Sequence, residues 1–92
     1  TSAGRYETAD GGASIAYGWE ASLWGLSGYE AGPGEEIISR DGSRIVTRGA
    51  KDGRGYIRNL FAANGRVYRI DLEFPLDKME EYLSLNEYVM IN

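Results

Sequence analysis

The sequence predicts an α+β fold, in which a twisted antiparallel β-meander of about five or six strands carries a C-terminal helix packed on one face. Three observations predict it. Asn-Gly and Asp-Gly dipeptides separate strand-like runs, which is typical of β-hairpins. The runs alternate apolar and polar residues with a period of two. The last segment instead spaces its apolar residues as a helix does.

The clearest element is the hairpin around Asn64-Gly65, because both residues of such a tight turn must accept positive φ. We expect its two strands over residues 54–62 and 66–74. After the turn, apolar and charged side chains alternate along the second strand. The hairpin therefore belongs to a sheet with one apolar inner face and one polar outer face.

A two-residue turn at Asn64-Gly65 also fixes the cross-strand neighbours of this hairpin. The expected pairs are Phe61 with Tyr68 and Ile57 with Leu72 on the inner face, and Arg58 with Asp71 on the outer face. Asn59 falls opposite Ile70 on the inner face. A buried amide needs partners, so we expect Asn59 to bond to the backbone or to a buried water.

The remaining strands are less regular. We expect them over residues 5–9, 13–23, 36–40 and 43–49, with turns at Asp10-Gly11, Asp41-Gly42 and Asp52-Gly53. The glycine-rich residues 25–34 predict a loop, since no helix tolerates that glycine density. It is a long connection for a small domain, so we expect it either to move or to cover part of the sheet.

The Asp52-Gly53 turn allows two registers. A two-residue turn sets Arg48 opposite Ile57 on the apolar face. A one-residue bulge, with glycine in the left-handed conformation, moves Arg44 and Arg48 to the polar face. We favour the bulge, because burying an unpaired arginine is costly.

The chain is expected to end in a helix. Pro75 ends the strand, and Asp77 followed by Glu80 resembles a capping box with aspartate in the cap position. Residues at helical spacing then form one stripe, namely Leu76, Met79, Tyr82, Leu83, Asn86, Val89 and Met90.

Composition bounds the function more than it identifies it. The 92 residues suit one small domain over residues 1–92, which starts at Thr1 without methionine and is whole or truncated at one or both ends. Cysteine and histidine are absent. Thiol nucleophiles, histidine-based triads and zinc or copper sites are therefore excluded within this chain, and we expect no catalytic residues, no metal and no cofactor. No apolar run is long enough to predict a transmembrane segment.

Charge is distributed unevenly along the chain. Residues 40–69 hold eight basic and two acidic residues, whereas the whole chain carries a net charge of −4. Aromatics between arginines on a sheet can stack nucleic-acid bases, so anion or nucleic-acid binding is one hypothesis. The acidic remainder of the domain argues against it, and protein binding is preferred. The candidate binding residues are Arg44, Arg48, Tyr56, Arg58 and Arg69 on the strands, with Trp24 and Tyr29 as interface anchors in the loop.

Asp71 and Glu73 raise a third hypothesis, since they lie on one strand face at a spacing compatible with a carboxylate-only hydrolase. The neighbouring Arg58 and Arg69 would lower both carboxyl pKa values, whereas a general acid needs one raised. This hypothesis is the least favoured of the three.

Four stretches together carry a family resemblance: residues 6–18, 44–49, 53–58 and 64–75, followed by the amphipathic helix. They resemble bacterial secreted or lipoprotein members of the PsbP-like fold family, which includes the photosystem II extrinsic protein and a Ran-binding relative. The chain departs from that pattern in lacking the strand and helix that usually come first, and in carrying a glycine-rich loop where relatives often carry a helix.

The resemblance implies an antiparallel sheet flanked by helices that serves as a non-catalytic accessory or binding domain. It implies a secreted or cell-envelope location, although a chain without cysteine leaves the redox compartment, and so a cytoplasmic location, open. The matching positions are structural, so no functional residue is carried over. We expect an unidentified protein partner, and a monomer or a homodimer.

Overall fold

The computed structural model describes residues 2–9 and 11–91, with the side chains of residues 3–9 and 11–88. Within these residues six strands form one antiparallel sheet, followed by a short 3-10 turn and a helix. This confirms the predicted fold class. The elements are β1 (Ser2–Glu7), β2 (Ser14–Ala21), β3 (Glu35–Arg40), β4 (Arg44–Lys51), β5 (Arg54–Ala63), β6 (Arg66–Pro75), η1 (Leu76–Lys78) and α1 (Met79–Ile91).

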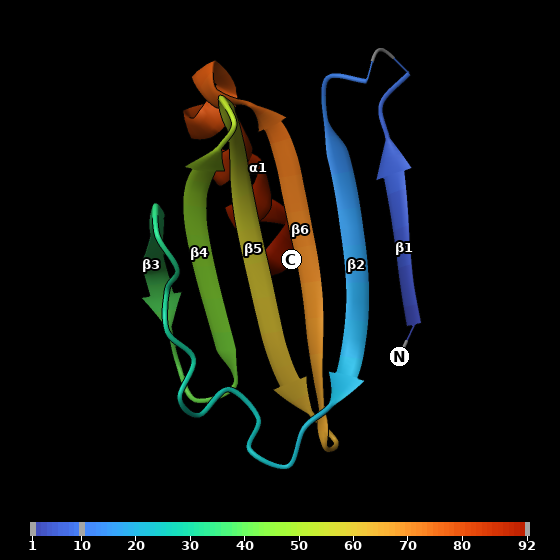
Figure 1. Cartoon of the computed structure of the whole chain (residues 1–92), viewed down its shortest axis with the longest axis vertical. Helices are drawn as coiled ribbons and strands as arrows, with labels where there is room; N and C mark the ends of the chain where they lie inside the picture. Colours follow the sequence, from blue (N-terminus) through green and yellow to red (C-terminus); the bar gives the residue numbers. More distant parts are fainter. Residues whose placement is uncertain (1, 10, 92) are drawn as a thin grey trace.

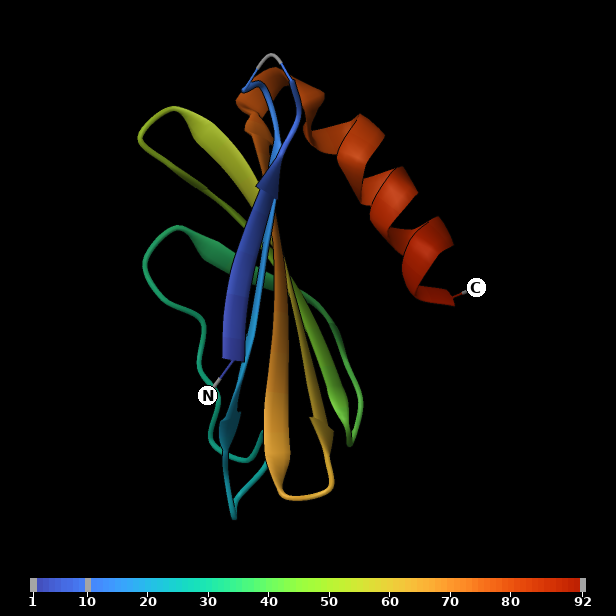
Figure 2. The same cartoon turned by 90° about the vertical axis from the view of Figure 1, so that its right-hand side faces the viewer.

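The strands lie in the order β1-β2-β6-β5-β4-β3, so β3 to β6 form a meander and the β1–β2 hairpin adds to the side of β6. The predicted meander therefore holds for four consecutive strands. The connection between β2 and β3 has to pass across the sheet, and it is the predicted glycine-rich loop. Helix α1 packs on one side of the sheet and this loop lies on the other (Figures 1 and 2).

We call these two sides the helix face and the loop face. The helix face carries the even-numbered residues of β1, β4 and β6 and the odd-numbered residues of β2 and β5. The loop face carries the other residues of these five strands. Ile57 and Phe74 are fully buried in the core of the helix face, where Tyr82 of α1 stacks on Phe74 with ring centroids 4.5 Å apart. Ile45 and Leu60 are buried on the loop face.

The Asn64-Gly65 hairpin has the predicted turn and register. Asn64 and Gly65 have φ values of 53° and 73°, as a type I′ turn requires. Arg58 faces Asp71, and the two expected apolar pairs, Phe61–Tyr68 and Ile57–Leu72, lie opposite one another. The partners of Asn59 are the carbonyl of Ile70 and the side chain of Asn86 in α1.

Because Asn64 sits in the left-handed region, Asn64→Val is expected to destabilise the protein by about 1–2 kcal/mol, since a β-branched residue resists positive φ. Thermal unfolding should show a lower Tm for this variant. Asn64→Gly serves as the control, because glycine accepts this conformation, and it should unfold close to the wild type. An unchanged Tm for Asn64→Val would refute the assigned turn.

The predicted bulge at Asp52-Gly53 is wrong. Both residues have positive φ, 54° and 78°, and Lys51 pairs with Arg54 in a two-residue turn. Arg48 consequently lies opposite Ile57, on the helix face. The cost expected for a buried arginine is avoided because Arg48 is 38% exposed and its Nε donates to Glu36 of β3 at 3.0 Å.

Arg44 shares the helix face with Arg48, so its predicted place on the polar face is wrong as well. Its guanidinium lies over the ring of Phe61, 5.7 Å from the centroid. This cation–π contact replaces the solvent contact that the bulge would have given it. Its Nε is buried, with no hydrogen-bond partner among the described residues.

The end of the chain is helical as predicted, but the predicted cap is wrong. Asp77 lies inside η1, which starts directly after Pro75 without a side-chain cap, and α1 begins at Met79. Met79, Tyr82 and Leu83 pack against the core and Asn86 is buried, whereas Leu76 is 44% exposed. The side chains of Val89 and Met90 lie outside the described residues.

Strand boundaries differ from the sequence prediction mainly at the amino-terminal end. The first strand covers Ser2–Glu7 instead of residues 5–9, and β2 ends at Ala21 instead of residue 23. Asp10, in the first predicted turn, lies outside the described residues. No helix of the described chain is long and apolar enough to cross a membrane.

Candidate binding surfaces

The helix covers only part of its face of the sheet. Its main contacts with the sheet are with β5 and β6, whereas β1 and β2 lie beyond it (Figure 1). The uncovered part is apolar and aromatic, and we call it the aromatic surface. It consists of Tyr6, Ile15, Tyr17, Trp19, Tyr68 and Ile70, which the strand register brings together.

Three members of the aromatic surface are well exposed: Tyr6 at 67%, Ile15 at 43% and Tyr17 at 39%. The rings of Tyr6 and Tyr17 stack with centroids 6.0 Å apart. A hydrogen bond with Tyr6 is the main reason why the pKa of Tyr17 is raised above 10.0. Tyr17 also lies directly over Gly4, where any side chain would collide with it. These contacts hold the exposed rings in place.

The aromatic surface adjoins β1, which is an outer strand of the sheet. Thr8 donates its amide to the carbonyl of Ala13 at 2.9 Å, so Thr8 and Ala13 form a hydrogen-bonded pair that continues the β1–β2 register. Such pairs alternate with non-bonded pairs in antiparallel strands. By that alternation Ala3, Arg5 and Glu7 direct their backbone groups outward, where no strand of the described chain pairs with them.

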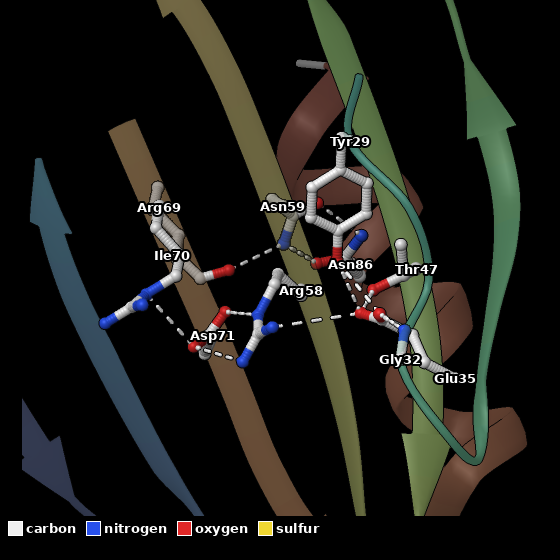
Figure 3. A network of polar contacts seen from close by, with 10 residues as sticks. All are labelled: Tyr29, Gly32, Glu35, Thr47, Arg58, Asn59, Arg69, Ile70, Asp71 and Asn86. Atoms are coloured by element: carbon white, nitrogen blue, oxygen red, sulfur yellow. Dashed lines mark hydrogen bonds and ion pairs between the residues drawn. The ribbon is translucent and has the colours of Figure 1, made fainter. Parts of the chain in front are cut away.

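A second polar arrangement lies on the loop face and centres on Glu35 (Figure 3). Its carboxylate accepts hydrogen bonds from the Tyr29 hydroxyl at 2.8 Å, the Gly32 amide at 2.8 Å and the Thr47 hydroxyl at 2.6 Å. The side chain is only 4% exposed. Glu35 therefore ties the crossing loop, through Tyr29 and Gly32, to the sheet.

Burial alone would oppose ionisation of Glu35. The hydrogen bonds from Thr47, Gly32 and Tyr29, together with the charge of Arg58 at 3.8 Å, outweigh it and lower the pKa of this carboxyl below 4.5. Burial and the bond to Glu35 raise the pKa of the Tyr29 hydroxyl in turn. The glutamate is thus held ionised as an acceptor, and not poised as a general acid.

This lowered pKa gives stability a defined pH dependence. The contribution of Glu35 is fully present above its ordinary value of 4.5 and is lost as the pH falls through the lower folded pKa. Glu35→Gln should lower the free energy of unfolding by about 1 kcal/mol at neutral pH. Below pH 4.5 the free energy of unfolding of this variant should depend less on pH than that of the wild type. Urea unfolding from neutral to acid pH measures both. The exposed Glu36→Gln is the control, and an equally flat profile there would contradict the assignment.

Next to Glu35, two arginines share one carboxylate. Arg58 donates its Nε to Asp71 at 3.1 Å, and Arg69 approaches the other oxygen of Asp71 at 3.3 Å (Figure 3). Burial disfavours the charge of Arg58, but Asp71 more than compensates, so its pKa is raised. Glu73 is held likewise by Arg54 at 3.0 Å. Both carboxylates of the hydrolase hypothesis therefore bind arginine.

The seven predicted binding residues do not form one site in the structure. Tyr29, Arg58 and Arg69 come together on the loop face, and Tyr56 lies beside Arg58, whose guanidinium is 5.7 Å from its ring centroid. The other residues do not join them: Arg44 and Arg48 lie on the helix face, and Trp24 is 80% exposed in the loop.

Sequence reasoning missed Glu35 and Thr47 as parts of the loop-face network. Glu35 stands directly before Glu36 in the sequence. Successive strand residues point to opposite faces, so alternation could have separated the two glutamates. It could not have supplied Tyr29 as the partner, since that contact depends on the path of the loop.

Comparison of the chain with protein-family models, with curated proteins and with solved structures finds no match. The functional conclusion therefore rests on the geometry of the two faces of the sheet.

Proposed function

We propose that this chain is a non-catalytic binding domain whose partner is a protein that docks on the aromatic surface. As part of the same proposal, it is an extracytoplasmic accessory domain of the PsbP-like type, secreted or held at the cell envelope. Cell fractionation tests the location, and recovery of the protein from the cytoplasm alone would refute that part.

The observation that carries the proposal is the exposure of Tyr6, Ile15 and Tyr17 on one side of the sheet. Contiguous apolar patches on a small protein mark interaction sites more often than scattered apolar residues do. Tyrosine and tryptophan are favoured anchors, because they bury a large area at little conformational cost. The stacked rings are already ordered in the unbound chain, which lowers the entropic cost of docking.

The outer edge of β1 indicates how the partner would bind. Its outward backbone groups can accept an extended segment as a seventh strand. That segment would place apolar side chains beside Tyr6. On the other face it would meet Arg5 and Glu7, which form an exposed ion pair at 3.2 Å, so it should carry an acidic and a basic residue two positions apart.

The alternative, anion or nucleic-acid binding through one basic face, has less support. The arginines of β4 lie on the helix face, and those of β5 and β6 near Asp71 lie on the loop face. Arg48, Arg54, Arg58 and Arg69 each pair with a carboxylate. Such pairing leaves no continuous positive field over the described strands for a phosphate backbone.

Two matched isoleucines allow a direct test. Ile15 lies in the aromatic surface and is 43% exposed, whereas Ile38 lies in β3 at the opposite edge and is 41% exposed. Wild-type, Ile15→Lys and Ile38→Lys chains would serve as baits in native extract at about 150 and 500 mM salt. The higher salt concentration screens interactions between exposed charges.

We expect one protein to be retained at both salt concentrations by the wild type and by Ile38→Lys, and at least about tenfold less by Ile15→Lys, because a lysine would have to be desolvated at the interface. Equal capture by the two lysine variants would refute docking on this surface. Capture that disappears as salt rises would favour the anion or nucleic-acid alternative instead.

A further inference from the structure

The loop face contains a pocket of about 500 Å³ between the crossing loop and the sheet. This volume lies within the range of small-molecule sites. Its floor is formed by β2, β5 and β6, where Gly18 leaves room and Leu60 and Val67 supply apolar surface. Its roof is the loop between Gly25 and Tyr29. We call this space the loop pocket.

The roof of the loop pocket is fixed at both ends. At one end the Ser22 amide donates to the carbonyl of Gly65 at 2.9 Å. At the other end the Tyr29 hydroxyl donates to Glu35, and Arg40 donates to the Tyr29 carbonyl at 3.0 Å. The pocket is therefore built into the fold, and a ligand would not have to order the loop first.

Charge gives the loop pocket one polar end. Arg58 and Arg69 line it, and both are oriented by Asp71. Asp71 forms an ion pair with the Nε atom of Arg69 at 3.3 Å, and among the described residues it is the ion-pair partner of that arginine. The terminal nitrogens of the Arg69 guanidinium, which is 52% exposed, are thus available as donors toward the pocket.

The strand register places the apolar end. Arg69 faces Leu60 across the β5–β6 pair, Arg58 faces Asp71 on one side of it, and Val67 faces Ala62 on the other. Two residues along a strand span about 7 Å, so the change from guanidinium to apolar surface occurs within a short molecule's length. Leu26 in the roof extends the apolar side.

The balance of charge limits the ligand to a monoanion. Asp71 lies between the guanidiniums of Arg58 and Arg69, and Arg58 also pairs with Glu35 at 3.8 Å, so these four groups carry no net charge together. A ligand anion would therefore be held by the terminal nitrogens of Arg69 and not by an excess of positive charge, and Glu20, which also lines the pocket, would repel a second negative charge. A doubly charged phosphate fits this arrangement less well than a carboxylate does.

We propose that the loop pocket binds a small monocarboxylate with an apolar body, its carboxylate on the terminal nitrogens of Arg69 and its apolar part against Leu60, Val67 and Leu26. Trp19 borders both the loop pocket and the aromatic surface, but Arg69, Leu60 and Val67 lie on the loop face, opposite the exposed rings of Tyr6 and Tyr17. The two proposals can therefore fail independently.

The test titrates the whole chain with hexanoate and follows its backbone amides by nuclear magnetic resonance. Acetate, hexanamide and inorganic phosphate are the comparison probes. Hexanoate should shift the amides of Gly18, Leu26 and Arg69 saturably and bind at least about tenfold more tightly than acetate, because four added methylenes lose water, and more tightly than hexanamide, which has no charge. Ile15→Lys should leave this titration unchanged.

Arg69→Gln should weaken hexanoate binding at least about tenfold, since a charge-assisted hydrogen bond is lost. Arg44→Gln is the matched control, because Arg44 lies on the helix face over the ring of Phe61, and neither residue lines the loop pocket. No saturable shift, equal affinity for hexanamide, tighter phosphate binding, or an equal loss in the control variant would each overturn the proposal.

Discussion

Replacing Phe74 with alanine is expected to lower the free energy of unfolding by about 3–5 kcal/mol. Phe74 is fully buried, and its ring stacks on Tyr82 of α1 at an interplanar angle of 7°. It also lies over Gly55, where an added Cβ would come within 2.6 Å of the ring. Truncation would leave a cavity in the contact between the sheet and the helix.

For a domain of this size the total stability is about 5–14 kcal/mol, so the Phe74→Ala variant should be close to unfolding. Urea denaturation monitored by circular dichroism measures the loss. Phe61→Ala is the control: Phe61 is only half-buried and lies beside Arg44, so its truncation should cost clearly less. Equal losses for both variants would contradict the assignment of the core to the contact between β6 and α1.

The second large effect concerns the amide pair that joins β5 to α1. Asn59 and Asn86 are 0% and 4% exposed, and each donates to the other, at 2.8 and 3.1 Å. Asn86→Leu should cost about 1–3 kcal/mol, because the Asn59 side chain stays buried and loses two of its hydrogen bonds.

The double variant Asn59→Leu with Asn86→Leu should be more stable than the sum of the two single losses predicts. Two apolar side chains leave neither amide buried without a partner, so we expect a coupling energy of at least about 1 kcal/mol in a double-mutant cycle. Strictly additive losses would mean that the two amides do not depend on each other.

The sequence carried most of the local information about the sheet. The Asn64-Gly65 turn predicted the pairing of Phe61 with Tyr68 and of Arg58 with Asp71, because a type I′ turn sets the register of both strands. The same register placed Asn59 on the apolar face, which indicated that its amide needs a hydrogen-bond partner. Asn86 was recognised on the helical stripe, but the angle at which α1 crosses β5 is not encoded in either segment alone.

The error at Arg48 has a physical cause. The cost of burying an arginine was weighed without its partner, and that partner, Glu36, belongs to a strand whose register was unknown. Long-range pairing was the missing information in general. Nothing in the local pattern of β2 indicates that it pairs with β6, yet this pairing sends the following loop across the sheet.

The candidate site on the loop face could likewise be predicted where it depends on strand alternation, but not where it depends on the path of the loop. Alternation along β5 and β6 placed Arg58 and Arg69 on one face, where the structure has them. The roof over them depends on Tyr29 reaching Glu35, a contact made by a segment without periodicity. The aromatic surface was missed because the width of sheet that α1 covers cannot be deduced from the helix sequence.

Hydroxyl-radical footprinting would test the role of the aromatic surface most directly, on the chain alone and in the complex recovered at high salt. We expect Tyr6, Ile15 and Tyr17 to be oxidised readily in the isolated chain, as their exposure requires, and to be protected several-fold in the complex. Ile38, at the opposite edge, should react equally in both. Unchanged oxidation of Tyr6, Ile15 and Tyr17 on binding, or protection centred on Ile38, would contradict a protein-binding role for this surface.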